Sequence, residues 1–207
     1  MRTSHITAQG RYGSPNYVPT MLFNMLRRLQ NGPNALIGGR KSAYDSEEQI
    51  IQDAMAAVFI GVNVVEAFMN IYFKVHAEEN STFTWYTTII SDLSKNSFGL
   101  GAKMIKWPKL CFGQVLDNKD PRYVEFEALK SLRNGLTHFK TSHTIIAPIP
   151  GVTIQGLSDL SLVGHLDADM PGRAVSAVIG FVELILEAHG FSPEQVSMAS
   201  RSWIGFS

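Results

Sequence analysis

Apolar residues recur every three to four positions along much of the chain, which is the spacing of one face of an α-helix. The repeat is present in six segments: 18–32, 50–75, 81–95, 120–139, 169–190 and 192–203. Helix-start signals support two of them, since Asp120–Pro121 and Ser192–Pro193 place a capping side chain before a proline. In the first segment Thr20 is a possible N-cap, and in the fourth the expected apolar stripe includes Val124. The pattern predicts an all-α protein, an antiparallel helical bundle of four to five main helices.

Three stretches interrupt this pattern. Residues 1–16 are rich in Gly, Ser, Thr and Pro, and residues 98–113 contain glycines and Pro108, so we expect a short helical turn followed by a loop there. Residues 141–168 turn to Gly, Pro, Ser and β-branched types, which indicates an irregular insertion. We therefore expect three regions, each named by its limits: a flexible arm with a short helix at 1–44, the bundle at 45–190 with 141–168 as its insertion, and a short C-terminal helix at 191–207.

The second segment contains 20 consecutive mostly apolar residues, 54–73, enough to span a membrane by length. Glu66 lies inside this run, between Asn63 and Asn70. A carboxylate there would cost about 2.5–3.5 kcal/mol in a bilayer. The spacing i, i+3, i+7 instead places the three polar groups in one line, facing either solvent or a polar site. The sequence favours a core helix of a soluble bundle and no membrane contact.

The bulk composition fits a globular protein, with 45% hydrophobic and 17% charged residues. A single cysteine, Cys111, excludes an internal disulfide and reads as a small buried hydrophobe. The start of the chain has no apolar signal segment, so we expect a cytoplasmic protein. The net charge is zero, yet residues 95–140 carry 9 basic and 4 acidic side chains. A polyanion would be drawn to that segment, although solvated lysines would give the same count.

The sequence "SLRNGLTHFK" lies within this basic segment. Asn134 and His138 are i and i+4 on a helix, so they project from one face. Arg133 is about 140° from His138 around the helix, an angle that a long guanidinium can bridge. An imidazole that exchanges protons near neutral pH, beside a cation and an amide, suits phosphodiester transfer. An Arg–Asn pair followed by His at this spacing is expected by chance roughly 0.01 times in this composition.

The segment "LKSLRNGLTHFK" resembles the Arg-Asn-x3-His signature of HEPN domains (higher eukaryotes and prokaryotes nucleotide-binding). "VVEAFMNIYF" is similar to their early core helix, with its acidic residue and following Asn, and "AVSAVIGFVELILEA" to their terminal helix. The resemblance covers about residues 45–190 and is strongest at the motif. It implies an all-α bundle that forms a homodimer, with two motifs sharing one cleft.

The resemblance also implies a function. Many HEPN proteins are metal-independent endoribonucleases, often toxins or defence effectors, some neutralised by a small nucleotidyltransferase antitoxin. His138 would be the general acid/base for attack of the RNA 2′-OH, leaving a 2′,3′-cyclic phosphate and a 5′-OH. Arg133 would stabilise the phosphate and Asn134 would orient its neighbours. Glu66 would fix Arg133 as a charged partner, with Asn70 beside it in the supporting shell. RNA is then the expected partner, with no cofactor and no metal.

One other interpretation of the motif stays open. The same three residues could form a structural polar network in a non-catalytic dimeric module that binds RNA or protein.

The other histidines offer weaker candidates for a functional site. Neither His143 nor the "HLDAD" run that includes His165, Asp167 and Asp169 has convincing metal-ligand spacing, and Asp169 suits a helix cap better. His76 and His189 read as surface or helix-end residues. Trp107 reads as a core residue, with base stacking as the alternative.

Overall fold

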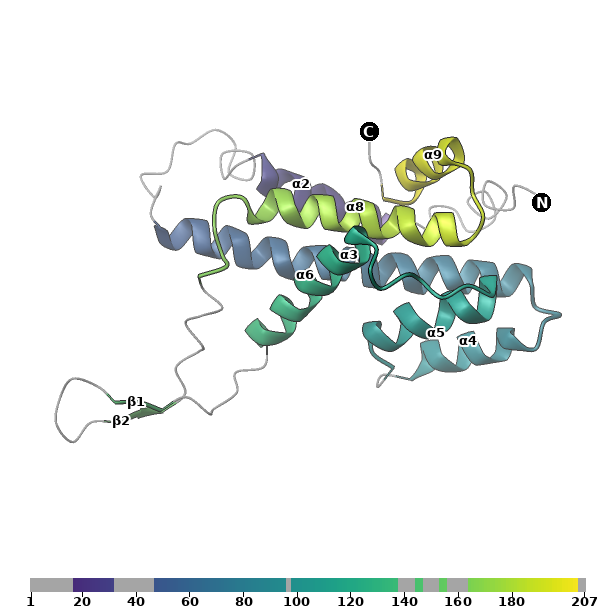
Figure 1. Cartoon of the computed structure of the whole chain (residues 1–207), viewed down its shortest axis with the longest axis horizontal. Coiled ribbons are helices and arrows are strands. Elements are labelled where there is room, and N and C mark those ends of the chain that lie inside the picture. The colour runs from purple at the N-terminus through teal and green to yellow at the C-terminus, as the bar shows by residue number, and fades with distance from the viewer. Residues whose placement is uncertain are drawn as a thin grey trace.

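Two long apolar helices, α3 (Glu47–Glu79) and α8 (Met170–Ala188), lie side by side at the centre of the structure (Figure 1). The computed structural model describes residues 17–31, 47–95, 98–137, 144–146, 153–155 and 164–204. The two helices run parallel, because Gly61 of α3 lies against Val178 of α8 and Tyr72, further along α3, contacts His189 just after α8. A parallel pair needs a long connection, and the described part of this one contains three further helices, α4, α5 and α6.

The other helices surround this pair (Figure 1). α2 (Tyr17–Gln30) packs against α3 and α8, and α6 (Pro121–Thr137) packs against the same two helices. α4 (Trp85–Ser94) and α5 (Leu100–Phe112) contact α3, and α9 (Pro193–Ile204) contacts α8 and α2. Strands β1 (Thr144–Ile146) and β2 (Thr153–Gln155) pair antiparallel. The predicted all-α fold is confirmed; α6 is antiparallel to α8 as expected of a bundle, whereas α3 and α8 are not antiparallel to each other.

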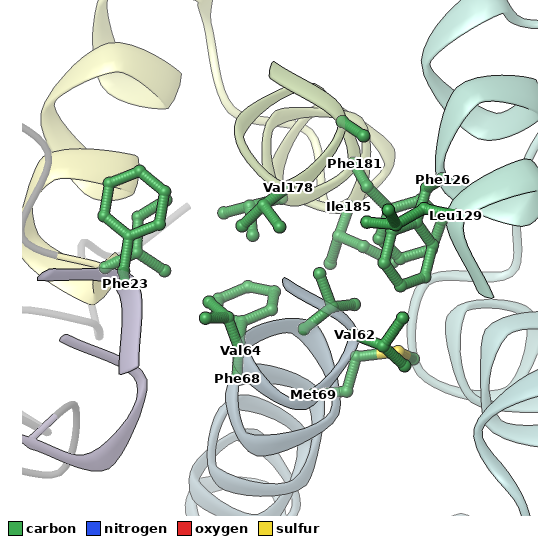
Figure 2. Close-up of a cluster of buried hydrophobic side chains, with 14 of the residues drawn as sticks. Phe23, Val62, Val64, Phe68, Met69, Phe126, Leu129, Val178, Phe181 and Ile185 are labelled. Carbon is green, nitrogen blue, oxygen red and sulfur yellow. The ribbon is translucent and has the colours of Figure 1, made fainter. Parts of the chain in front are cut away.

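One hydrophobic core joins helices from both ends of the chain. Figure 2 shows Phe23 of α2 on one side of the α3–α8 pair and Phe126 of α6 on the other. Phe126 and Phe181 are in ring contact, with centroids 4.4 Å apart. Trp203 of α9 is fully buried and meets Phe68 edge-on. The sequence-based limits at 44/45 and 190/191 therefore separate α2 and α9 from a core to which both contribute.

Two glycines allow α6 to approach the central pair closely. A β-carbon at Gly61 would stand 3.1 Å from Leu129 Cδ2, and one at Gly180 would stand 3.0 Å from Arg122 Cγ. Both distances are shorter than ordinary van der Waals contact between carbons. Because Gly61 faces Leu129 and Gly180 faces Arg122, α6 runs antiparallel to α8 across the pair.

Arg122 fixes the start of α6 to the end of α8. Its guanidinium bonds both carboxylate oxygens of Glu187 at 2.8 Å and the carboxylate of Asp120 at 2.9 and 3.1 Å. Asp120 also accepts the backbone N–H of Arg122 at 2.9 Å, which caps α6 as the sequence predicted. The hydrogen bonds that Arg122 donates lower the pKa of Asp120, and the same bonds to Glu187 and Asp120 raise the pKa of Arg122.

Several local expectations were wrong. α2 already begins at Tyr17, so Thr20 lies inside the helix, after Pro19 in the first turn where an N–H is not needed. α5 is a full helix of 13 residues that includes Pro108, and it ends only before Gly113, whose φ is +71°. Burial of its apolar face outweighs the hydrogen bond that proline removes. Val124 is 51% exposed, and Phe126 faces the core instead.

The long central helix has the length and composition of a membrane span between Gln49 and Glu79. Half of its most apolar 18-residue window is buried inside the structure. A core helix of a bundle has these same properties, and α3 packs against α2, α8, α4 and α6. The apolar character of α3 is thus accounted for by its neighbours.

Replacing Gly61 by Val is expected to lower the free energy of unfolding by about 1–3 kcal/mol, because the new side chain meets Leu129 and Val178. Gly172→Val is the matched control, since the nearest atom to a β-carbon there is 3.9 Å away. Urea unfolding of both variants measures the difference. Equal losses in the two would show that the close approach of α6 at Gly61 does not set the cost.

Candidate functional site at the end of α6

The last two turns of α6 carry the first two residues of the Arg-Asn-x3-His motif (Arg133, Asn134, His138). α6 continues through Gly135 to Thr137, whose hydroxyl donates to the Arg133 carbonyl at 2.7 Å. His138 lies outside the described residues. The structure thus places Arg133 and Asn134 together at a helix end but does not describe the third member of the motif.

Arg133 and Asn134 differ in their surroundings. The Asn134 side chain is exposed, whereas Arg133 is half-buried. The Nε of Arg133 is buried and has no hydrogen-bond partner among the described residues. A buried N–H without an acceptor is destabilising by about 1–3 kcal/mol, so an oxyanion that reached this atom would gain a bond that the free protein lacks. The position combines a fixed cation with an amide that is open to solvent.

Glu66 and Asn70 do not support Arg133 as predicted. The Glu66 carboxylate lies 3.1 Å from the Lys103 Nζ, and the Asn70 side-chain oxygen accepts from the same Nζ at 2.9 Å. The direction of α6 explains the correction. Gly61 faces Leu129, and α6 then runs toward the N-terminal end of α3, which takes Arg133 away from Glu66.

Glu66 and Asn70, two members of the polar line on α3, bind Lys103 instead. It lies on α5 and is only 6% exposed. Besides its two oxygen partners, its Nζ lies 5.5 Å from the centroid of the Trp107 ring. A buried ammonium is tolerated only when its donors are satisfied. Glu66 and Asn70 therefore anchor α5 to α3, while Asn63 remains exposed.

The basic excess of residues 95–140 is largely neutralised by carboxylates from elsewhere in the chain. Asp92 pairs with Lys106 at 2.7 Å and with Lys95 at 3.9 Å. Glu66 and Glu187 also come from outside the segment, and they pair with Lys103 and Arg122. These three acidic groups reduce the local excess from five to two. The segment offers a polyanion less positive charge than its sequence suggested.

The remaining candidates take structural roles. Trp107 is fully buried and donates to Asp92 at 3.2 Å, so it is a core residue and not a base-stacking platform. Asp167 pairs with Arg173 at 2.7 Å, and Asp169 occupies the N-cap of α8 without a side-chain cap bond. Within the part of the chain that the structure describes, no three His, Cys, Asp or Glu side chains are grouped to hold a metal. His143 lies outside that part.

A histidine cluster was missed by the sequence reasoning. His76 is 8% exposed and stacks on Trp85, with ring centroids 5.4 Å apart. Its ring also contacts His189, which stacks on Phe112 and shares a hydrogen bond with the Tyr72 hydroxyl. The only available signal was the i, i+4 spacing of Tyr72 and His76 on one helix face. The cluster joins the ends of α3, α5 and α8.

Comparisons with known protein families, with curated proteins and with solved structures found no match for this chain. The resemblance to HEPN domains therefore rests on the sequence pattern.

Lys103→Met is expected to lower the free energy of unfolding by about 1–3 kcal/mol, because it leaves the half-buried Glu66 without its cation. Lys74→Met is the matched control, since the Lys74 side chain is exposed and its Nζ lies 3.9 Å from the Glu78 carboxylate. Chemical denaturation of both proteins gives the comparison. A loss no larger than that of the control would argue against an anchoring role for Lys103.

Burial raises the pKa of Cys111 from 9.0 to about 12, so the folded protein keeps the thiol proton where the unfolded chain releases it. The free energy of unfolding should be unaffected by this group below about pH 8.5 and fall as the pH rises further. Cys111→Ala is expected to reduce the slope by up to about 1.4 kcal/mol per pH unit. Urea unfolding at about pH 8, 9 and 10 tests this, and an unchanged slope would refute it.

Proposed function

We propose that the protein is a metal-independent endoribonuclease of the HEPN type, with Arg133, Asn134 and His138 as its catalytic residues. The observation that carries the proposal is the Arg-Asn-x3-His motif at the end of α6, where Arg133 has a buried, unpartnered Nε beside an exposed Asn134. An anion that arrives from solvent meets the exposed Asn134 amide and the exposed part of the half-buried Arg133 side chain. The α-helical fold is compatible with the family.

The reaction needs one proton to be removed and one to be supplied. His138 accepts the proton of the RNA 2′-OH as its oxygen attacks the adjacent phosphorus. The bond from phosphorus to the 5′-oxygen breaks, and that oxygen takes up a proton to leave as a 5′-OH, with a 2′,3′-cyclic phosphate on the other fragment. Arg133 stabilises the charge that develops on the phosphate oxygens. Asn134 orients Arg133 or His138 by hydrogen bonding.

The proposal extends to the biological setting that the resemblance implies. A homodimer would bring two motifs into one cleft, and a cytoplasmic toxin or defence effector would act on cellular or foreign RNA. A nucleotidyltransferase antitoxin is the partner that such a toxin would need. No metal or cofactor enters the reaction as written, because acid–base chemistry and the guanidinium supply every step.

One observation favours a second function, a non-catalytic module that binds a partner through α6. Several basic side chains of the segment 95–140 are paired: those of Lys103, Lys106 and Arg122 all engage carboxylates. A strand of RNA would meet fewer free cations along this segment than its sequence suggests, and the affinity for RNA depends on free cations. A protein partner does not have this requirement.

In excess EDTA, the wild-type protein is expected to cleave RNA, while Arg133→Ala and His138→Ala are expected to lose at least about 100-fold in rate. Arg201→Ala is the matched control, because it removes an exposed arginine on α9. Gel analysis of single-stranded and structured RNA gives the rates, and the fragments should carry 2′,3′-cyclic phosphate.

Two results would contradict the nuclease proposal. If none of the folded proteins cleaves RNA, the module without catalysis becomes the better description. If all four cleave equally, the activity belongs to another site or to a contaminant.

A further inference from the structure

A groove runs between α6 and the first half of α8, on the same helix that carries the motif. Its volume is about 1070 Å³, and it is partly open to solvent. Its apolar lining includes Leu129 and Leu132 of α6 and Met170 of α8, and Gln30 at the end of α2 also lines it. This volume lies at the upper end of small-molecule pockets, which reach about 1,000 Å³.

The walls of the groove have the periodicity and size of a helix-binding surface. On α6 the lining residues 125, 128, 129 and 132 are spaced i, i+3, i+4, i+7, so that wall is about two turns, or roughly 10 Å, long. Both walls contain small residues: Ala128 and Ser131 on α6, and Gly172 and Ser176 on α8. Short side chains on both walls let the backbone of a third helix approach, as ridges-into-grooves packing requires.

The charges on the rim select the partner. Arg173 is the one lysine or arginine among the lining residues, and Asp167 already pairs with it at 2.7 Å. Glu125 and Asp169 also line the groove, and neither makes an ion pair with another described residue. The free charge on the rim is therefore negative. A phosphate backbone would be repelled, whereas a lysine or arginine would be attracted.

We propose that this groove docks a short amphipathic α-helix of a partner protein, one with an apolar face of two turns flanked by lysine or arginine. Leucine-like side chains at i, i+3 and i+7 of that helix fill the apolar floor. Its basic flanks meet Glu125 at one wall and Asp169 at the other. The proposal stands on groove shape and rim charge, and it holds whether or not the motif is catalytic.

The location would let such a partner affect the access of other molecules to the motif. Leu132 lines the groove and Arg133 is the next residue of α6. A helix bound in the groove would therefore lie within one turn of the motif. A partner helix in the groove would occupy space at the end of α6 that a strand of RNA would also need. It would do so without touching the motif itself.

A displayed library of helix-favouring peptides of about 14 residues tests the proposal. Leucines are fixed at i, i+3 and i+7, and the flanking positions encode Lys or Glu at random. Selection uses the full-length wild-type protein, with counter-selection on Ala128→Trp, which fills the groove. The recovered peptides are then titrated by fluorescence anisotropy against wild type, Ala128→Trp, Glu125→Lys and the control Glu194→Lys, an exposed acidic residue on α9.

Lysine should be enriched over glutamate at the flanks. The recovered peptide should bind Ala128→Trp and Glu125→Lys at least tenfold more weakly than wild type, and Glu194→Lys unchanged. Circular dichroism of each variant separates a blocked groove from an unfolded protein. If no recovered peptide depends on the groove for binding, the proposal is overturned, because the groove is then not a docking site for a partner helix. Enrichment of glutamate, or loss of RNA binding in Ala128→Trp, would also overturn it, the latter by assigning the groove to RNA.

Discussion

The crossing of α6 over the parallel α3–α8 pair depends on the absence of two side chains, at Gly61 and Gly180. Each glycine admits a neighbour from α6, Leu129 in one case and the stem of Arg122 in the other. A methyl group at either position would push α6 outward by a few tenths of an ångström, and the lever of a 17-residue helix would amplify the shift at its far end. The end of α6 is where Arg133 lies, so the core packing sets the position of the candidate site.

The same crossing keeps Glu66 apart from Arg133, which the sequence analysis expected to be its partner. Arg122 and Glu187 hold the first turn of α6 against the last turn of α8, and from there α6 runs toward the N-terminal end of both central helices. Glu66 lies on the other side of the crossing and pairs with Lys103 of α5. One line of polar residues on α3 thus serves the attachment of α5, while the motif on α6 is left without an acidic partner among the described residues.

Apolar periodicity predicted most of the helices, and the predictions that were wrong have physical causes. The helices at 85–94, 121–137 and 170–188 were predicted because their apolar residues repeat at helical spacing, and Asp120 before Pro121 marks the start of the second. α5 was not, because Pro108 is a helix breaker by local rules and only tertiary burial of Met104 and Trp107 overrides it. The partner of Glu66 could not be read from sequence, since it depends on the direction in which α6 and α5 cross α3. His76 was misplaced for the same reason: its burial is produced by Trp85 and His189, which come from other elements.

Charge is the property for which sequence counting was least informative. A stretch with five surplus cations reads as a surface for polyanions, yet folding brings Asp92, Glu66 and Glu187 to it from three other helices. Paired cations gain little from a phosphate, because each must first give up a carboxylate. One donor of Arg133 is buried without an acceptor among the described residues, and the acidic residues Glu125 and Asp169 line the groove beside this end of α6. A molecule that approaches α6 therefore meets a single guanidinium that favours an anion at one end and a negative rim that favours a cation along the groove. An RNA-cleaving enzyme would use only the first feature and a docked helix only the second, so the two surfaces of α6 are chemically suited to different partners.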